Sequence, residues 1–112
     1  MNGSEFVFVY STFPDEASAR RVGEALVTAR LAACVNIYPP MQSIYEWQEK
    51  LESEPEIAAF IKTRRAKVDE VIAAARPLHP YTVPCFLLLP IAGGNEDYLA
   101  WARAQTQGKT SA

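Results

Sequence analysis

Residues 32–63 read AACVNIYPPMQSIYEWQEKLESEPEIAAFIKT, and this stretch decides the fold. Ala32–Tyr38 is short and apolar and predicts a strand, which Pro39-Pro40 ends or bends because proline cannot donate to a strand ladder. Ser43–Trp47 alternates between two faces, as a strand does. Gln48-Glu49-Lys50 then predicts the tip of a hairpin, although it lacks the Gly or Asn that tight turns favour.

The segments on either side of this hairpin alternate between strand and helix patterns. They are a strand buried on both faces at Glu5–Thr12, a helix that includes Val22–Ala29, a returning strand core at Ile57–Thr63, a helix at Arg64–Arg76, a buried strand at Cys85–Leu89 and a last helix at Glu96–Gln105. This order predicts an α+β, ferredoxin-like βαββαβ sandwich with an extended central hairpin and an added C-terminal helix. We predict a single domain over residues 1–112, with a disordered tail from about residue 107.

The composition is that of a globular chain, with 49% hydrophobic and 21% charged residues among 112. The net charge of −2 argues against a nucleic-acid partner, which requires a basic face, and against a polybasic membrane anchor. No apolar run is long enough to span a membrane, and the start of the sequence lacks a signal-peptide pattern. We therefore predict a cytoplasmic protein with no nucleic-acid or membrane partner.

Three side chains of the sequence are candidate soft metal ligands. Cys34 and Cys85 form no CxxC pair, and in a cytosolic chain they are reduced thiols, either small buried hydrophobic residues or ligands. His79 is the only histidine, so a four-ligand site within one chain is hard to build. Its place in a proline-rich turn suits a binding site, but also a structural histidine held by backbone groups. No nucleophile motif indicates an enzyme.

Aromatic side chains occur on the predicted hairpin and on the last helix. Tyr45 and Trp47 would be exposed on a projecting hairpin, and together with Trp101 they predict a subunit interface. The alternative is that the last helix folds back over the hairpin within one chain. Glu56 and Lys62 lie at the two ends of the returning strand, where they are solvated or hold a polar ligand at a subunit cleft.

Taken together, these motifs resemble the CutA1 family of divalent-cation tolerance proteins. The matching pieces, in the family's order, are Pro14-Asp15-Glu16-Ala17, Leu31-Ala32-Ala33-Cys34-Val35-Asn36, Ser43-Ile44-Tyr45-Glu46-Trp47, Glu56 with Ile61-Lys62-Thr63, His79-Pro80-Tyr81 with Val83-Pro84, and Tyr98-Leu99-Ala100-Trp101. The resemblance implies a ferredoxin-like subunit in a tight homotrimer similar to PII signalling proteins. It also implies a role in tolerance of copper and other divalent ions, with no established catalytic activity.

The chain departs from the family pattern at several ligand positions. Members with a copper site place Cys where this chain has Ser11 and a His pair at Leu78 and His79, so only one of three ligands remains. Thr82 and Cys85 replace two usual carboxylates, which weakens a hard-cation site and adds a soft thiol. Glu49 replaces a usual hairpin glycine, which predicts a looser or differently turned tip.

Two functions follow as hypotheses from this resemblance. The first is a trimeric, non-enzymatic protein of divalent-cation tolerance, with no required cofactor. It would bind Cu(II) or another divalent cation weakly through His79, with Cys34 or Cys85 as further candidate ligands. The alternative is a PII-like sensor that holds a small anionic metabolite in an intersubunit cleft formed by Glu56, Lys62, Tyr81 and His79.

Overall fold

The structure, a computed structural model, describes residues 5–107, so residues 108–112 of the predicted tail lie outside it. Its elements are β1 (Phe6–Phe13), α1 (Glu16–Thr28), β2 (Cys34–Ile37), β3 (Met41–Trp47), β4 (Lys50–Arg64), α2 (Val68–Ala75), β5 (Leu87–Pro90) and α3 (Glu96–Gln105). Short 3-10 turns precede and follow α2. The predicted α+β, ferredoxin-like arrangement is confirmed, and the last helix has the predicted bounds.

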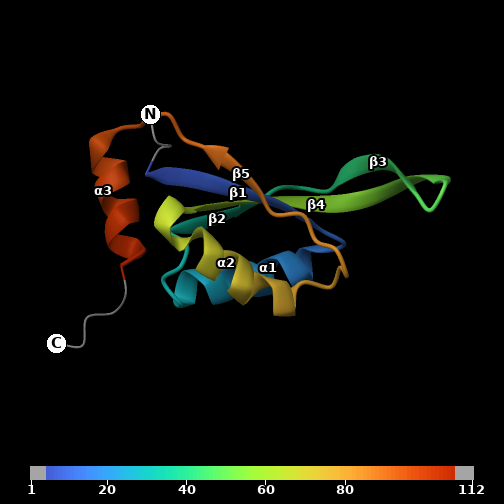
Figure 1. Cartoon of the computed structure of the whole chain (residues 1–112), viewed down its shortest axis with the longest axis horizontal. Coiled ribbons are helices and arrows are strands. Elements are labelled where there is room, and N and C mark those ends of the chain that lie inside the picture. The colour runs from blue at the N-terminus through green and yellow to red at the C-terminus, as the bar shows by residue number, and fades with distance from the viewer. Residues whose placement is uncertain (1–4, 108–112) are drawn as a thin grey trace.

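An antiparallel sheet with the order β2-β4-β1-β5 forms one layer, and α1 and α2 cover one of its faces (Figure 1). The core lies between these layers because every second side chain of β1 faces the helices. Val7, Val9 and Phe13 of β1 are fully buried there against Leu26 of α1 and Val71 of α2. Phe8, Tyr10 and Thr12, on the other face of β1, are only half-buried, so the strand is not buried on both faces as we predicted.

The hairpin projects beyond the sheet because β4 is about twice as long as its neighbour β1. Its second half pairs with β1 and β2, and its first half, Lys50–Glu56, pairs only with β3. β2 and β3 pair one after the other with β4, Ile37 opposite Ala59 and Met41 opposite Glu56. The segment with the two prolines therefore has one residue more than the stretch of β4 that it faces. A bulge of this kind bends a strand, which confirms the predicted effect of Pro39-Pro40.

The tip of the hairpin is a two-residue turn at Gln48 and Glu49, between the paired residues Trp47 and Lys50. Both turn residues have positive φ, 51° and 69°, which is the left-handed conformation that a tight two-residue turn requires. The tip therefore keeps the geometry that glycine favours, although neither residue is glycine. The cost is backbone strain, because a Cβ atom crowds the carbonyl group in this region.

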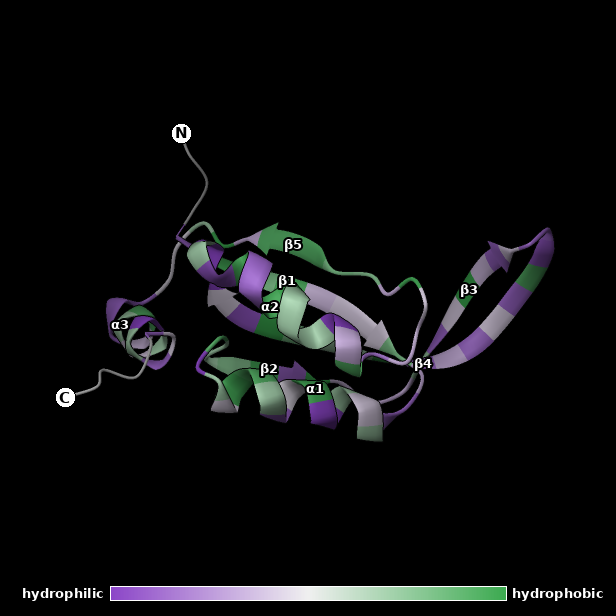
Figure 2. Ribbon diagram, turned by 60° about the horizontal axis from the view of Figure 1, so that its bottom comes forward, coloured by the Kyte–Doolittle hydropathy of each residue, from purple (hydrophilic) through white to green (hydrophobic). Residues whose placement is uncertain are grey.

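The predicted buried strand near the end of the chain is wrong in position and in burial. β5 begins at Leu87 rather than Cys85 and pairs only with β1, so its other edge is open within the chain. Leu87 and Leu89 are exposed on the face of the sheet that no described helix covers, and Leu88, opposite the buried Val9, is exposed because β5 lies at the edge of the sheet. Figure 2 shows β5 as a hydrophobic strand at the margin of the molecule.

Helix α3 lies at the end of the molecule opposite the hairpin (Figure 1). Arg64 holds the end of this helix by donating to the hydroxyl and carbonyl oxygens of Thr106, both at 2.8 Å. Arg30 donates to two further carbonyl oxygens at the same helix end, those of Ala104 and Gln107. Cations at a helix C-terminus satisfy carbonyl groups that lack partners within the helix.

Candidate functional site

A pocket of about 380 Å³ lies where the projecting hairpin meets the body of the fold. The end of β1, the hairpin strands β3 and β4, and the loop before β5 all contribute to its lining. Its chemistry-bearing residues are Thr12, Tyr45, Trp47, Glu56, Tyr81 and Cys85. Of the predicted ligand cleft, Glu56 and Tyr81 line this pocket and His79 lies directly behind it.

His79 fixes the loop that carries Tyr81. The imidazole Nε2 lies 2.9 Å from the carbonyl oxygen of Thr12, and because a carbonyl can only accept, Nε2 carries the proton and donates. Nδ1 accepts a hydrogen bond from the backbone N–H of Tyr81 at 3.1 Å. The ring stacks on Phe13 with centroids 4.5 Å apart. His79 is buried, and this burial lowers its pKa below the usual 6.5.

Tyr81 and Glu56 form the polar centre of the pocket. The Tyr81 hydroxyl donates to the Glu56 carboxylate across 2.6 Å, a short distance typical of a hydrogen bond to an ionised acceptor. Burial and the nearby carboxylate raise the pKa of Tyr81, because both disfavour the phenolate. Tyr81 therefore stays a protonated donor at neutral pH, and it holds the carboxylate at the pocket wall.

Lys62 does not line this pocket within one chain. It is six residues from Glu56 on β4, which is roughly 20 Å along a strand. Its ammonium group lies over the rings of Phe8 and Tyr98, 5.5 and 5.6 Å from their centroids. Within one chain the pocket thus has a carboxylate and no lysine, and the predicted intersubunit cleft with Lys62 stays a prediction.

The soft ligands predicted from the sequence do not converge on one point. Cys34 accepts a weak hydrogen bond from the Asn36 side chain at 3.8 Å, whereas Cys85 contacts the Thr12 hydroxyl at 3.8 Å. Both thiols are half-buried. Within residues 5–107 no group of three or more His, Cys, Asp or Glu side chains is placed to hold a metal.

The copper ligands of the family pattern do not fit this chain as a tight site. Ser11 is fully buried in the core, and its hydroxyl has no hydrogen-bond partner among residues 5–107. Leu78 carries no donor, and both nitrogens of His79 are used within the chain. A copper ion would have to displace the Tyr81 N–H to reach Nδ1, so we derive no chemistry through bound copper.

The predicted interface aromatics lie at two ends of the molecule. Tyr45 and Trp47 are on the hairpin, 42% and 56% exposed, whereas Trp101 is on α3 and contacts only Tyr98 among aromatic rings of the described residues. Figure 1 shows α3 and the hairpin at opposite ends of the molecule. The alternative in which the last helix folds back over the hairpin within one chain is therefore wrong.

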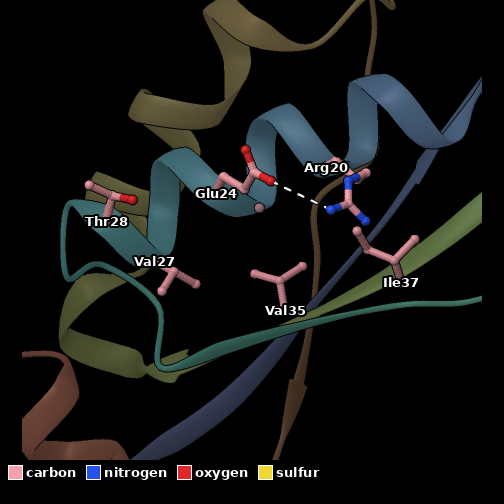
Figure 3. A pocket seen from close by; sticks show the side chains of 7 residues that line it. Arg20, Glu24, Val27, Thr28, Val35 and Ile37 are labelled. Atoms are coloured by element: carbon pink, nitrogen blue, oxygen red, sulfur yellow. Dashed lines mark ion pairs between the residues drawn. The ribbon is translucent and has the colours of Figure 1, made fainter.

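A second cavity, of about 310 Å³, lies between α1 and the open edge of β2. Figure 3 shows Val27, Val35 and Ile37 along this groove, with the ion pair between Arg20 and Glu24 at its rim. The groove has no buried polar group aimed into it. Sequence reasoning missed this groove and the role of Thr12 in the first pocket, because neither has a sequence motif.

Comparison with known proteins gives the same class of fold and identifies the family. The profile of the CutA1 divalent ion tolerance protein family matches residues 7–105. The divalent-cation tolerance protein CutA of Thermus thermophilus is 45% identical over 98 residues, covering 88% of this chain and 95% of the relative. That of Pectobacterium atrosepticum is 39% identical over 98 residues, covering 88% and 89%. The chain belongs to the CutA1 family.

Solved structures support the same assignment. The divalent cation tolerance protein from Thermus thermophilus has a TM-score of 0.88 at 43% identity, covering 91% of this chain and 99% of that one. The crystal structure of CutA from Xylella fastidiosa has a TM-score of 0.90 at 36% identity, covering 93% and 100%. The solved structures therefore support both the fold and the assignment to the divalent-cation tolerance family.

The names of relatives place them in different compartments. One from Arabidopsis thaliana is called chloroplastic, and one from Archaeoglobus fulgidus is called periplasmic. In this chain, no helix among the described residues is long and apolar enough to cross a membrane. The cytoplasmic location of this chain stays a prediction.

Proposed function

We propose that this chain assembles as a homotrimer and acts, without catalysing a reaction, in tolerance of divalent cations, copper among them. Membership of the CutA1 family supports the tolerance role. The observation that carries the assembly is the hairpin, which projects from the body with no covering element (Figure 2).

The hairpin has the features of a surface that another copy covers. Ile44 and Leu51, on the face opposite Tyr45 and Trp47, are 70% and 79% exposed. The β1 side of β4 has no strand partner in the described chain over Lys50–Glu56, so its backbone groups are free to pair. An exposed apolar strand with an open edge favours pairing between chains. In the proposed homotrimer, head-to-tail contacts through the hairpin close into a ring of three copies.

Sedimentation equilibrium tests the trimer. We expect a trimer at micromolar concentration and its dissociation by Trp47→Asp, because a charge would enter a desolvated interface. Ala73→Asp, on the exposed side of α2, is the matched control and should stay trimeric. A stable monomer of the parent chain, or an intact trimer of Trp47→Asp, would contradict the assignment.

Copper binding should be weak, because each missing donor leaves a coordination position to water. Competitive titration against a chelator of known affinity would compare the parent, His79→Ala and the double variant Ser11→Cys with Leu78→His. We expect the double variant to bind far more tightly than the parent. Residual binding by the parent should depend on His79 and should weaken at acidic pH as the imidazole becomes protonated. Tight binding that survives His79→Ala would instead assign the site to Cys34 or Cys85.

A further inference from the structure

One face of the hairpin carries a row of carboxylates beside a row of aromatic rings. Tyr45 lies opposite Glu52 in the antiparallel register. Side chains of directly opposed residues share a face, and alternate residues of a strand share it too. Glu52, Glu54 and Glu56 therefore lie on the same face as Tyr45 and Trp47.

The pocket at the base of this face has a carboxylate on one wall and aromatic rings on the others. Tyr45, Trp47 and Tyr81 line it together with Glu56, and the lining contains no lysine or arginine. Lys50 is the single cation on this face of Met41–Glu56, but it lies at the tip, opposite Trp47, and does not line the pocket.

The surrounding charges make the pocket electronegative. The pKa of the Tyr45 phenol is raised, first by desolvation and then by the carboxylates of Glu54, Glu52 and Glu56. A phenolate at this position would be repelled by their negative charge. Asp15 acts on Tyr81 in the same direction, from the start of α1. Acidic groups thus lie near these rings on two elements, β4 and the start of α1.

This chemistry suits an organic cation better than a metal ion. Hard divalent ions require several oxygen ligands around one point, and here a single carboxylate reaches the pocket wall. Aromatic faces instead attract diffuse cations such as alkylated ammonium groups, whose apolar substituents are also desolvated favourably. A volume of about 380 Å³ accommodates a small molecule.

We propose that the pocket binds a small organic ammonium ion, with its charge beside the Glu56 carboxylate and its carbon substituents against Tyr45, Trp47 and Tyr81. The Tyr81 hydroxyl keeps the carboxylate in place, and His79 keeps Tyr81 in place through its two hydrogen bonds. All of these groups come from one chain, so a monomer would already carry the pocket, whereas in the proposed trimer the copy that contacts Trp47 would form part of its outer wall. A neighbouring copy on the hairpin would narrow the mouth of the pocket.

The test is calorimetric titration of the full chain with choline and with 3,3-dimethyl-1-butanol, its neutral counterpart of nearly the same shape. We expect choline to bind about tenfold or more tightly than the alcohol, and to bind less tightly as salt is added. Equal affinity for the two molecules, or no choline binding at millimolar concentration, would overturn the proposal.

Variants then assign the binding to this pocket. Glu56→Gln keeps an acceptor for Tyr81 but removes the charge, so we expect choline affinity to fall about tenfold. Trp47→Leu should weaken it roughly two- to fivefold through loss of one ring face. Glu46→Gln removes the same charge from the other face of the hairpin and should leave binding unchanged. Equal loss in Glu56→Gln and Glu46→Gln would show only a general charge effect and overturn the site.

Sedimentation of the same samples separates this proposal from the assembly. A trimer that fails to bind choline refutes the organic-cation site and leaves the proposed function standing. A monomeric parent chain whose choline binding depends on Glu56 refutes the proposed trimer and leaves the organic-cation site standing.

Discussion

Replacing His79 by phenylalanine tests the structural role that the fold gives this residue. The imidazole donates to the Thr12 carbonyl, accepts from the Tyr81 N–H and stacks on Phe13. Phenylalanine has a similar planar ring and can keep the stacking contact. The substitution therefore removes two hydrogen bonds while it changes the packing little.

The size of the effect follows from these two bonds. A hydrogen bond within a protein contributes about 1 kcal/mol net, and a buried group left without a partner costs about 1–3 kcal/mol. We expect His79→Phe to lower the free energy of unfolding by roughly 2–3 kcal/mol at pH 7.5. The loop that carries Tyr81 should lose order first, since its tie to β1 passes through the imidazole.

The same residue makes stability depend on pH. Burial holds the pKa of His79 below its unfolded value of about 6.5, so the folded state favours the neutral ring. Protonation would also place an N–H on Nδ1 against the Tyr81 N–H. The stabilisation is therefore complete above pH 6.5 and is lost as the pH falls toward the lower pKa of the folded state.

Urea denaturation at pH 7.5 and 5.5, at one fixed protein concentration, measures both effects. The parent should lose more stability between these pH values than His79→Phe, because His79 is the only histidine in the sequence. Equal stability of the two proteins at pH 7.5 would refute the structural role. An equal pH dependence in both would refute the depressed pKa.

Two further predictions concern stability. Ser11→Ala should raise the free energy of unfolding by about 1 kcal/mol in urea denaturation, because the buried Ser11 hydroxyl has no hydrogen-bond partner in the described part of the chain; a less stable variant would mean that the hydroxyl is satisfied. Glu49→Gly should raise it by roughly 0.5–1 kcal/mol, because glycine adopts φ near 69° without strain, whereas the control Glu49→Ala keeps its Cβ and should gain nothing; an equal gain in both variants would assign the effect to charge instead.

The sequence alone determined the order of the elements, the hairpin and the family. These depend on local signals: alternation in Ser43–Trp47, the proline pair Pro39-Pro40, and motifs such as His79-Pro80-Tyr81 that need no knowledge of contacts. The bounds of α3 were predicted correctly because its acidic start and short apolar pattern are contained within ten residues. Only the family resemblance, not periodicity, indicated the trimer, which stays a proposal.

Only the tertiary structure decided which residues share a site. Lys62 and Glu56 lie on one strand, but β4 is so long that its two ends serve different surfaces. Trp101 and Trp47 are both exposed aromatics, but the position of α3 beside Arg64 places them at opposite ends. The pocket joins Thr12, Tyr45 and Tyr81, which are far apart in the sequence, and the hydrogen bonds of His79 depend on the distance between β1 and a loop. Such distances arise from packing of the whole chain, so no local pattern in the sequence records them.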